Sequence, residues 1–209
     1  MIKTILNFGD SWAHAADTGR ENGYATIISK ELGMNLQDYS IPSTGNPRMI
    51  LQFQTFLEEA YQPNNQYIAL FFVSAVERLI FFDEKQPYDL WPDSFEDFYT
   101  RWYSDSYGEF VTNSSLIVLQ HMCRSRGIRD VYILGWQTPI LWPDVDQSRF
   151  LFEGRTSIAQ KFGGKGLTPL YDLINRVNSI YLIPNNGHPS VAGHRFIADS
   201  VLHHLKLDQ

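Results

Sequence analysis

The feature that most constrains this chain is an unbroken apolar run, YIALFFV, at residues 67–73. A strand that is apolar on both faces is typical of the centre of a parallel sheet, which helices cover on both sides. Shorter apolar runs at 5–8 and 131–134 predict further buried strands, with segments of helical periodicity between them. Strands that alternate with helices predict an α/β fold, a three-layer α/β/α sandwich around a central parallel sheet.

The remaining elements are predicted from periodicity and from stop signals. Weaker strand patterns lie at 34–41 and 179–183, and helical patterns lie at 23–32, 49–61, 112–126 and 191–205. Gly33 and Gly127 are the expected helix stops, and Thr112 or Asn113 is the expected cap of the third helix. At 209 residues, we expect a single domain over 1–209, with long loops at about 137–170.

Charge is concentrated in one segment. The net charge is −6, and residues 81–110 hold eight acidic residues against Lys85 and Arg101. The same segment is rich in aromatic residues, including Trp91 and Trp102. We therefore interpret about 79–110 as an insertion, which is a substrate-binding region, a lid or an oligomer contact. The negative charge argues against nucleic-acid binding.

Several classes of protein are disfavoured by composition. The single cysteine, Cys123, rules out an internal disulfide framework and a cysteine-based zinc cage. The acids and histidines show no metal-ligand spacing, so we expect no metal and no cofactor. No apolar segment has the length of a signal peptide core or of a membrane span, so we expect a cytoplasmic protein without membrane contact.

The first predicted strand ends in Gly9-Asp10-Ser11. A serine in the turn after a parallel strand presents its hydroxyl at the carboxyl edge of the sheet, where open α/β sheets place their ligand crevices. The alternative is a purely structural turn. A nucleophilic role would require a histidine at the same edge.

His188 meets that requirement best among the six histidines. It lies between the predicted strand at 179–183 and the last helix, and Pro189 excludes it from helical conformation. Ser190 is the expected N-cap of that helix. A serine after the first strand and a histidine after the last can meet across one crevice, where the imidazole would take the serine proton. His194 is expected to be a residue of the last helix that packs near Ser190 rather than a second base.

These residues resemble the SGNH (GDSL-type) hydrolases. Gly9-Asp10-Ser11 is similar to the first block of that family, Gly45-Asn46 to its second, and residues 188–194 (HPSVAGH) to its last. The resemblance covers nearly the whole chain and implies a flavodoxin-like fold. It also implies Ser11 as nucleophile, His188 as base, and an oxyanion hole formed by Ser11, Gly45 and Asn46.

Two positions depart from the family pattern. The family usually carries an aspartate three residues before the histidine, where this chain has Asn185. An asparagine accepts a hydrogen bond from the imidazole but does not neutralise its charged form. After the central strand the family has Gly-x-Asn-Asp, whereas this chain has Ser74 and, four residues later, Arg78. We expect Ser74 or Arg78 to be a substitute oxyanion donor or a substrate contact. The alternative is that Arg78 forms an ordinary exposed pair with Glu77.

The resemblance therefore predicts a serine esterase or deacylase with a Ser-His dyad or a variant triad. The alternative is an SGNH-like binding or structural protein with weak or no turnover. The aromatic insertion suggests an O-acetylated glycan as substrate, with a small-molecule ester as the simpler choice. Trp12 and His14 either line the pocket or begin the first helix.

Overall fold

The computed structural model describes residues 2–82, 87–90, 92, 95–163, 180–183 and 187–207. Its centre is a parallel four-stranded sheet in the order β2-β1-β3-β6. The strands are β1 (Lys3–Phe8), β2 (Asn35–Asp38), β3 (Gln66–Val73) and β6 (Arg129–Leu134). The apolar run at 67–73 thus forms an inner strand, as predicted.

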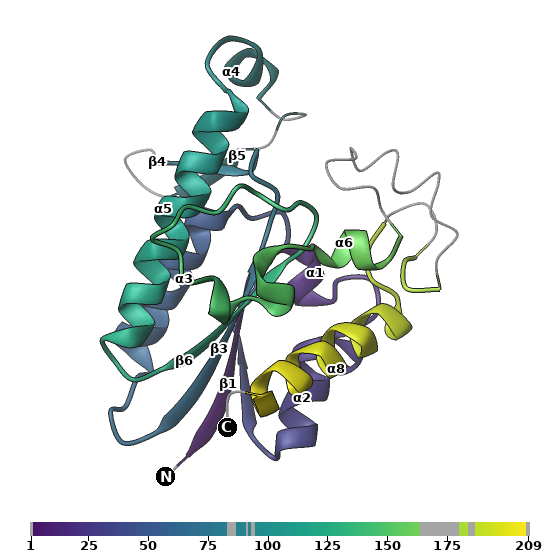
Figure 1. Cartoon of the computed structure of the whole chain (residues 1–209). Coiled ribbons are helices and arrows are strands. Elements are labelled where there is room, and N and C mark those ends of the chain that lie inside the picture. Colours follow the sequence, from purple (N-terminus) through teal and green to yellow (C-terminus); the bar gives the residue numbers. More distant parts are fainter. Residues whose placement is uncertain are drawn as a thin grey trace.

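Two helix layers bury the two faces of this sheet. Helices α2 (Tyr24–Leu32) and α8 (Val191–Leu207) cover one face, and α3 (Asn46–Glu59) and α5 (Asp105–Arg124) cover the other (Figure 1). Successive β3 side chains alternate between the faces, so Phe72 packs with α2 and α8 while Phe71 packs with α3 and α5. The α/β/α sandwich is therefore confirmed.

One predicted helix boundary and one predicted strand are wrong. Helix α5 begins at Asp105 rather than near 112, because Ser104 accepts a hydrogen bond from the Tyr107 N–H and caps the helix there. Residues 180–183 form no strand of the sheet; Leu182 makes only an isolated antiparallel bridge with Pro189. The predicted Gly33 stop is confirmed, with a left-handed φ of 61°.

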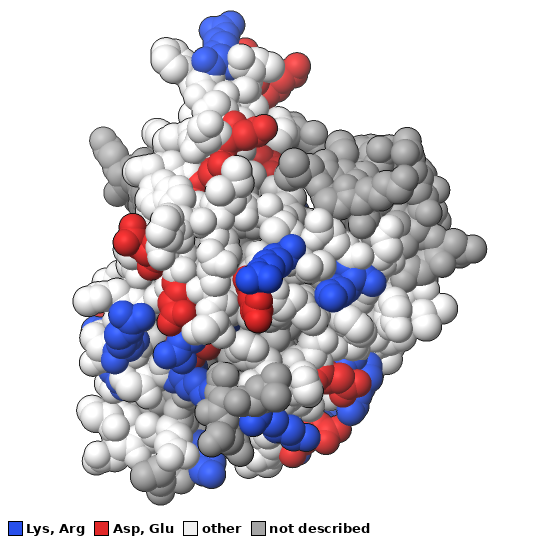
Figure 2. Space-filling view, viewed as in Figure 1, with Lys and Arg blue, Asp and Glu red and all other residues white. Residues whose placement is uncertain are grey.

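The expected insertion contains a β-hairpin and a short helix. Strands β4 (Leu79–Phe82) and β5 (Pro87–Leu90) pair antiparallel, and α4 (Glu96–Arg101) follows. Residues 105–110 belong instead to the first turns of α5. Acidic side chains are visible at the protruding end of the molecule that carries α4 (Figure 2).

Short helices occupy the connections at the carboxyl edge of the sheet and over β6. They are α1 (Ser11–His14), η1 (Arg20–Asn22), η3 (Gln147–Arg149), η4 (Leu151–Gly154) and α6 (Ile158–Lys161). Cys123, in the last turn of α5, is fully buried, consistent with a core role. Within the described part of the chain, no helix has the length and apolar character needed to cross a membrane.

Candidate active site

The turn after β1 places Ser11 at the first position of α1. Gly9 has a φ of 139°, and a Cβ atom there would lie 2.7 Å from Cβ of Phe72, so the turn requires glycine. Asp10 caps α1 by accepting a hydrogen bond from the Trp12 N–H at 2.9 Å. Ser11 is consequently held at the rim of the sheet, with 9 % of its surface exposed.

Asp10 itself is completely buried, and both of its carboxylate oxygens have partners. Besides the Trp12 N–H, its carboxylate accepts a hydrogen bond from Ser74 Oγ at 2.7 Å and pairs with the Arg78 guanidinium at 3.1 Å. A buried carboxylate needs such partners to offset its lost hydration. Ser74 and Arg78 therefore hold the turn that carries Ser11.

His188 lies beside Ser11 across the carboxyl edge of the sheet. Its Nε2 atom is 3.1 Å from Ser11 Oγ, although 177 residues separate the two in sequence. The backbone on either side of His188 is fixed: the Ile183 N–H donates to the His188 carbonyl at 2.8 Å, and Ser190 Oγ accepts from the Gly193 N–H, as an N-cap does. The sequence-predicted serine and histidine are thus within hydrogen-bond reach.

The other ring nitrogen of His188 contacts a carboxylate that the sequence analysis missed. Nδ1 of His188 is hydrogen-bonded to Oδ2 of Asp17. Asp17 follows α1 in a turn that begins at Ala15, whose φ of 53° ends the helix in the left-handed region. The predicted partner, Asn185, lies outside the described residues. In the sequence, the feature that could have pointed to Asp17 is the short turn at residues 15–19 (AADTG), directly after the segment that carries Ser11.

The two residues of the second predicted block, Gly45 and Asn46, have different contacts. The Asn46 side chain is fully buried and holds β3 in place: its amide donates to the Ser74 carbonyl and to Thr112 Oγ1, and it accepts from the Ser74 N–H. Gly45 precedes α3, and its N–H donates to Asp89 Oδ1 at 3.2 Å. A Cβ atom on Gly45 would lie 2.4 Å from the Arg78 carbonyl oxygen, so this close approach also requires glycine.

The other predicted pocket residues have structural contacts. Trp12 is fully buried in α1 and packs against Trp136 at 4.2 Å between ring centroids, so of the two predicted alternatives the structure shows the start of the first helix. His14 Nδ1 lies 3.0 Å from the Ser40 carbonyl oxygen, and Arg20 contacts the same ring. Within the residues that the structure describes, no three His, Cys, Asp or Glu side chains are grouped so as to hold a metal ion.

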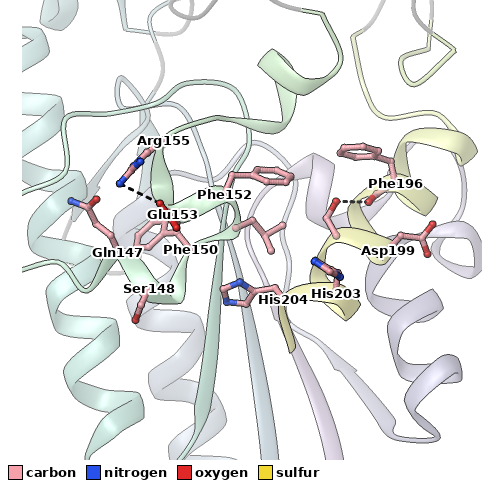
Figure 3. A pocket seen from close by; sticks show the side chains of 12 residues that line it. Gln147, Ser148, Phe150, Phe152, Glu153, Arg155, Phe196, Asp199, His203 and His204 are labelled. Atoms are coloured by element: carbon pink, nitrogen blue, oxygen red, sulfur yellow. Dashed lines mark hydrogen bonds and ion pairs between the residues drawn. The ribbon is translucent and has the colours of Figure 1, made fainter. Parts of the chain in front are cut away.

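A cavity of about 770 Å³ lies away from this site, between η4 and α8. Phe152 and Phe196 line it from the two sides, and Glu153 pairs with Arg155 at its edge (Figure 3). Neither Ser11 nor His188 is among its lining residues. The His188 side chain is 27 % exposed and the Asp17 side chain is 37 % exposed.

Solved structures resemble this chain over nearly its whole length. A member of the lipolytic protein G-D-S-L family from Veillonella parvula DSM 2008 is 14 % identical, with 96 % of this chain and 97 % of that chain covered and a TM-score of 0.50. TesA is also 14 % identical, with 97 % and 98 % covered and a TM-score of 0.57. The chain has the fold of the G-D-S-L lipolytic proteins.

An acetyl xylan esterase, Est2A from the rumen bacterium Butyrivibrio proteoclasticus, shares this G-D-S-L-type fold at a TM-score of 0.57. It is 13 % identical, and the match covers 99 % of this chain and 64 % of that one. No protein-family model matches the sequence, and no curated protein does. The likeness therefore lies in the fold.

The buried His194 predicts a pH dependence of stability. Burial, and then the charge of nearby His188, lower the pKa of His194 from 6.5 to about 4. In the unfolded chain, His194 takes up a proton near pH 6.5. In the folded protein, it takes up a proton only near pH 4, so the unfolded state binds more protons between these two values. We expect the free energy of unfolding to fall by about 3 kcal/mol over that interval.

Denaturant titrations between pH 7 and pH 4 measure this effect. His194→Gln should flatten the decline, whereas His203→Gln, at an exposed position on the same helix, should leave it unchanged. Equal declines in wild type and His194→Gln would contradict the assignment.

Proposed function

We propose that this chain is a serine-dependent ester hydrolase with Ser11 as nucleophile, His188 as general base and Asp17 as the acid that orients the imidazole. The observation that carries the proposal is the continuous arrangement Ser11 Oγ, His188 Nε2, His188 Nδ1, Asp17 Oδ2. A hydroxyl, an imidazole and a carboxylate in this order recur on unrelated folds as an acyl-transfer triad. The G-D-S-L-type fold supports the same reaction class.

The first half of the reaction transfers the acyl group to the enzyme. His188 Nε2 takes the proton of Ser11 Oγ while that oxygen attacks the acyl carbon, and the carbonyl oxygen becomes an oxyanion. His188 then gives the proton to the departing alcohol oxygen. Asp17 keeps the Nδ1 proton in place, so Nε2 is free to accept, and it stabilises the imidazolium that forms.

The second half returns the free enzyme. Water loses a proton to His188 Nε2 and attacks the acyl carbon, and the carboxylic acid leaves as the proton passes to Ser11 Oγ. The backbone N–H groups of Ser11 and Gly45 are the proposed oxyanion donors. The Asn46 amide is already engaged with Ser74 and Thr112, so we assign it a structural role instead.

A binding protein without turnover is the second candidate function. The observation in its favour is that the Gly45 N–H already donates to Asp89, while the segment after β3 offers no asparagine and its Ser74 hydroxyl is hydrogen-bonded to Asp10. Loss of one oxyanion donor typically lowers the rate about 10²- to 10³-fold. Labelling of the serine distinguishes the two functions.

A fluorophosphonate probe should label the wild-type protein on Ser11, because the reaction needs only an activated hydroxyl. Ser11→Ala should not be labelled, and Ser106→Ala, which removes an exposed serine in the first turn of α5, should be labelled like wild type. Mass spectrometry of the labelled peptide gives the site. An unlabelled wild-type protein that also fails to hydrolyse p-nitrophenyl acetate above the Ser11→Ala background would exclude the hydrolase.

Asp17→Asn should lower kcat for p-nitrophenyl acetate by about 10³- to 10⁴-fold, because an amide at this position favours the wrong imidazole tautomer. Glu21→Gln, at an exposed position four residues further on, is the matched control and should retain wild-type activity. Asn185→Ala tests the position three residues before His188, where the family usually carries its aspartate. If Asn185→Ala loses the activity and Asp17→Asn keeps it, the orienting residue is Asn185.

We propose an O-acetylated glycan as the substrate, with neutral rather than acidic sugars favoured by the surrounding carboxylates. Exposed aromatic side chains suit stacking on sugar rings, and Trp102 at the end of α4 is 77 % exposed. The similar fold of an acetyl xylan esterase supports this substrate class. Trp91 lies outside the described residues.

Trp102→Ala should raise KM for acetylated xylo-oligosaccharides and leave KM for p-nitrophenyl acetate unchanged, because only the longer substrate would reach α4. Phe81→Ala, which removes another exposed aromatic side chain (60 % exposed), tests whether the effect belongs to Trp102. Equal KM values for wild type and Trp102→Ala on the oligosaccharide would remove the argument for a glycan.

A further inference from the structure

The carboxylate of Asp89 sits on the backbone N–H of Gly45. Oδ1 of Asp89, on β5, accepts this hydrogen bond at 3.2 Å. The contact is supported two residues earlier, where Arg48 Nη1 donates to the Pro87 carbonyl at 3.2 Å. Strand β5 is thus docked against the start of α3, at the end of the sheet where the nucleophile turn lies (Figure 1).

Gly45 is tied closely to the nucleophile turn. The loop before it is held to the Gly9 carbonyl, which accepts from the Ile41 N–H at 2.9 Å and from Thr44 Oγ1 at 3.3 Å. On the other side, the Arg78 backbone lies against Gly45 while the Arg78 guanidinium pairs with Asp10. The Gly45 N–H and Ser11 therefore belong to one rigid cluster.

Asp89 is partly buried beside positively charged groups. Burial is the largest effect and raises the pKa of the Asp89 carboxyl, while the Gly45 N–H and the positive charges of Arg48 and Arg78 lower it. The carboxylate thus has one backbone hydrogen-bond donor and two positive charges that favour its ionised form. The same hydrogen-bond donor and positive charges would stabilise a tetrahedral oxyanion formed at Ser11.

We propose that Asp89 is a built-in competitor for the oxyanion hole, so that its carboxylate must leave the Gly45 N–H before that donor can stabilise the reacting oxygen. The proposal rests on the proposed hydrolase function, because the role of the Gly45 N–H comes from it. A single N–H carries one hydrogen and cannot serve both oxygens fully. The contact with Asp89 therefore keeps the enzyme in a low-activity state until substrate or a partner displaces β5.

Tyr99 provides a fixed point for such a displacement. Its hydroxyl lies within hydrogen-bond distance of two carbonyl oxygens, that of Leu90 at 3.0 Å and that of Glu77, and its single hydrogen is shared between them. These bonds hold the C-terminal end of β5 and the segment before β4 to α4. Asp89 precedes Leu90, so the proposed displacement moves the carboxylate away from Gly45 while the contact between Tyr99 and Leu90 stays.

The test compares rate constants for fluorophosphonate labelling and kcat/KM for p-nitrophenyl acetate in wild type, Asp89→Ala and Asp89→Asn. A charge-assisted hydrogen bond at this donor predicts that Asp89→Ala reacts about 10- to 100-fold faster than wild type. Asp89→Asn keeps the shape without the charge and should lie between the two. Asp97→Asn, a fully exposed carboxylate on α4, is the matched control and should react like wild type.

The outcomes separate this proposal from the proposed function. Equal rates in wild type and Asp89→Ala, with Ser11 labelled in both, overturn the competitor role and leave the hydrolase intact. Failure to label Ser11 in every variant, Asp89→Ala included, overturns the hydrolase and the competitor role together. A slower Asp89→Ala with native circular dichroism makes Asp89 a supporting residue and also overturns the proposal.

Hydrogen exchange on the wild-type protein tests the same contact without a substitution at Asp89. Phosphonylation of Ser11 places the polar phosphoryl oxygen of the adduct in the hole, so amide exchange in residues 87–90 should accelerate relative to the unlabelled protein. Exchange in β6, on the far side of β3, serves as the internal reference and should not change. Unchanged exchange in 87–90 after complete labelling would contradict displacement.

Discussion

The buried carboxylate of Asp10 is the interaction on which the rest of the site depends. It joins three segments: its own turn after β1, the end of β3 through Ser74, and the segment that leads into β4 through Arg78. Because a buried charge must keep its partners, these three segments have one arrangement available to them. Ser11 follows Asp10 directly, so the direction of its hydroxyl is set by that arrangement.

This constraint bears on the two departures from the family pattern. Arg78 pairs with Asp10 and its backbone lies against Gly45, so the segment without the third-block asparagine still holds the proposed oxyanion donor, the Gly45 N–H. Asp17, in the turn after α1, is the proposed orienting carboxylate. The proposed nucleophile and the proposed acid therefore come from one short stretch of chain, and His188 comes from a distant one.

Much of the architecture was predictable because it depends on repeating patterns. The inner strand β3 and the helices α2 and α8 follow from hydrophobic periodicity and from glycine stops such as Gly33. The position of Ser11 at the carboxyl edge of the sheet follows from topology, because Ser11 comes directly after the parallel strand β1. His188 meets it there although the strand predicted before it is only an isolated bridge between Leu182 and Pro189, so that half of the topological argument was wrong.

The rest could not be predicted because it depends on individual tertiary contacts. Asp17 resembles any acidic turn residue until His188 is seen beside it, and Trp12 resembles a pocket residue until Trp136 and Phe72 pack on its ring. The early start of α5 depends on Ser104 as a cap in a segment without clear periodicity. The contact between Asp89 and Gly45 joins residues 44 positions apart and has no local signature.

Proton NMR of His188 tests the central claim most directly. A carboxylate bound to Nδ1 predicts a strongly downfield-shifted ring proton in the wild-type protein, which persists in Asn185→Ala and disappears in Asp17→Asn. This result would show that Asp17 orients the imidazole toward Ser11. A downfield proton that survives Asp17→Asn and disappears in Asn185→Ala would contradict the account.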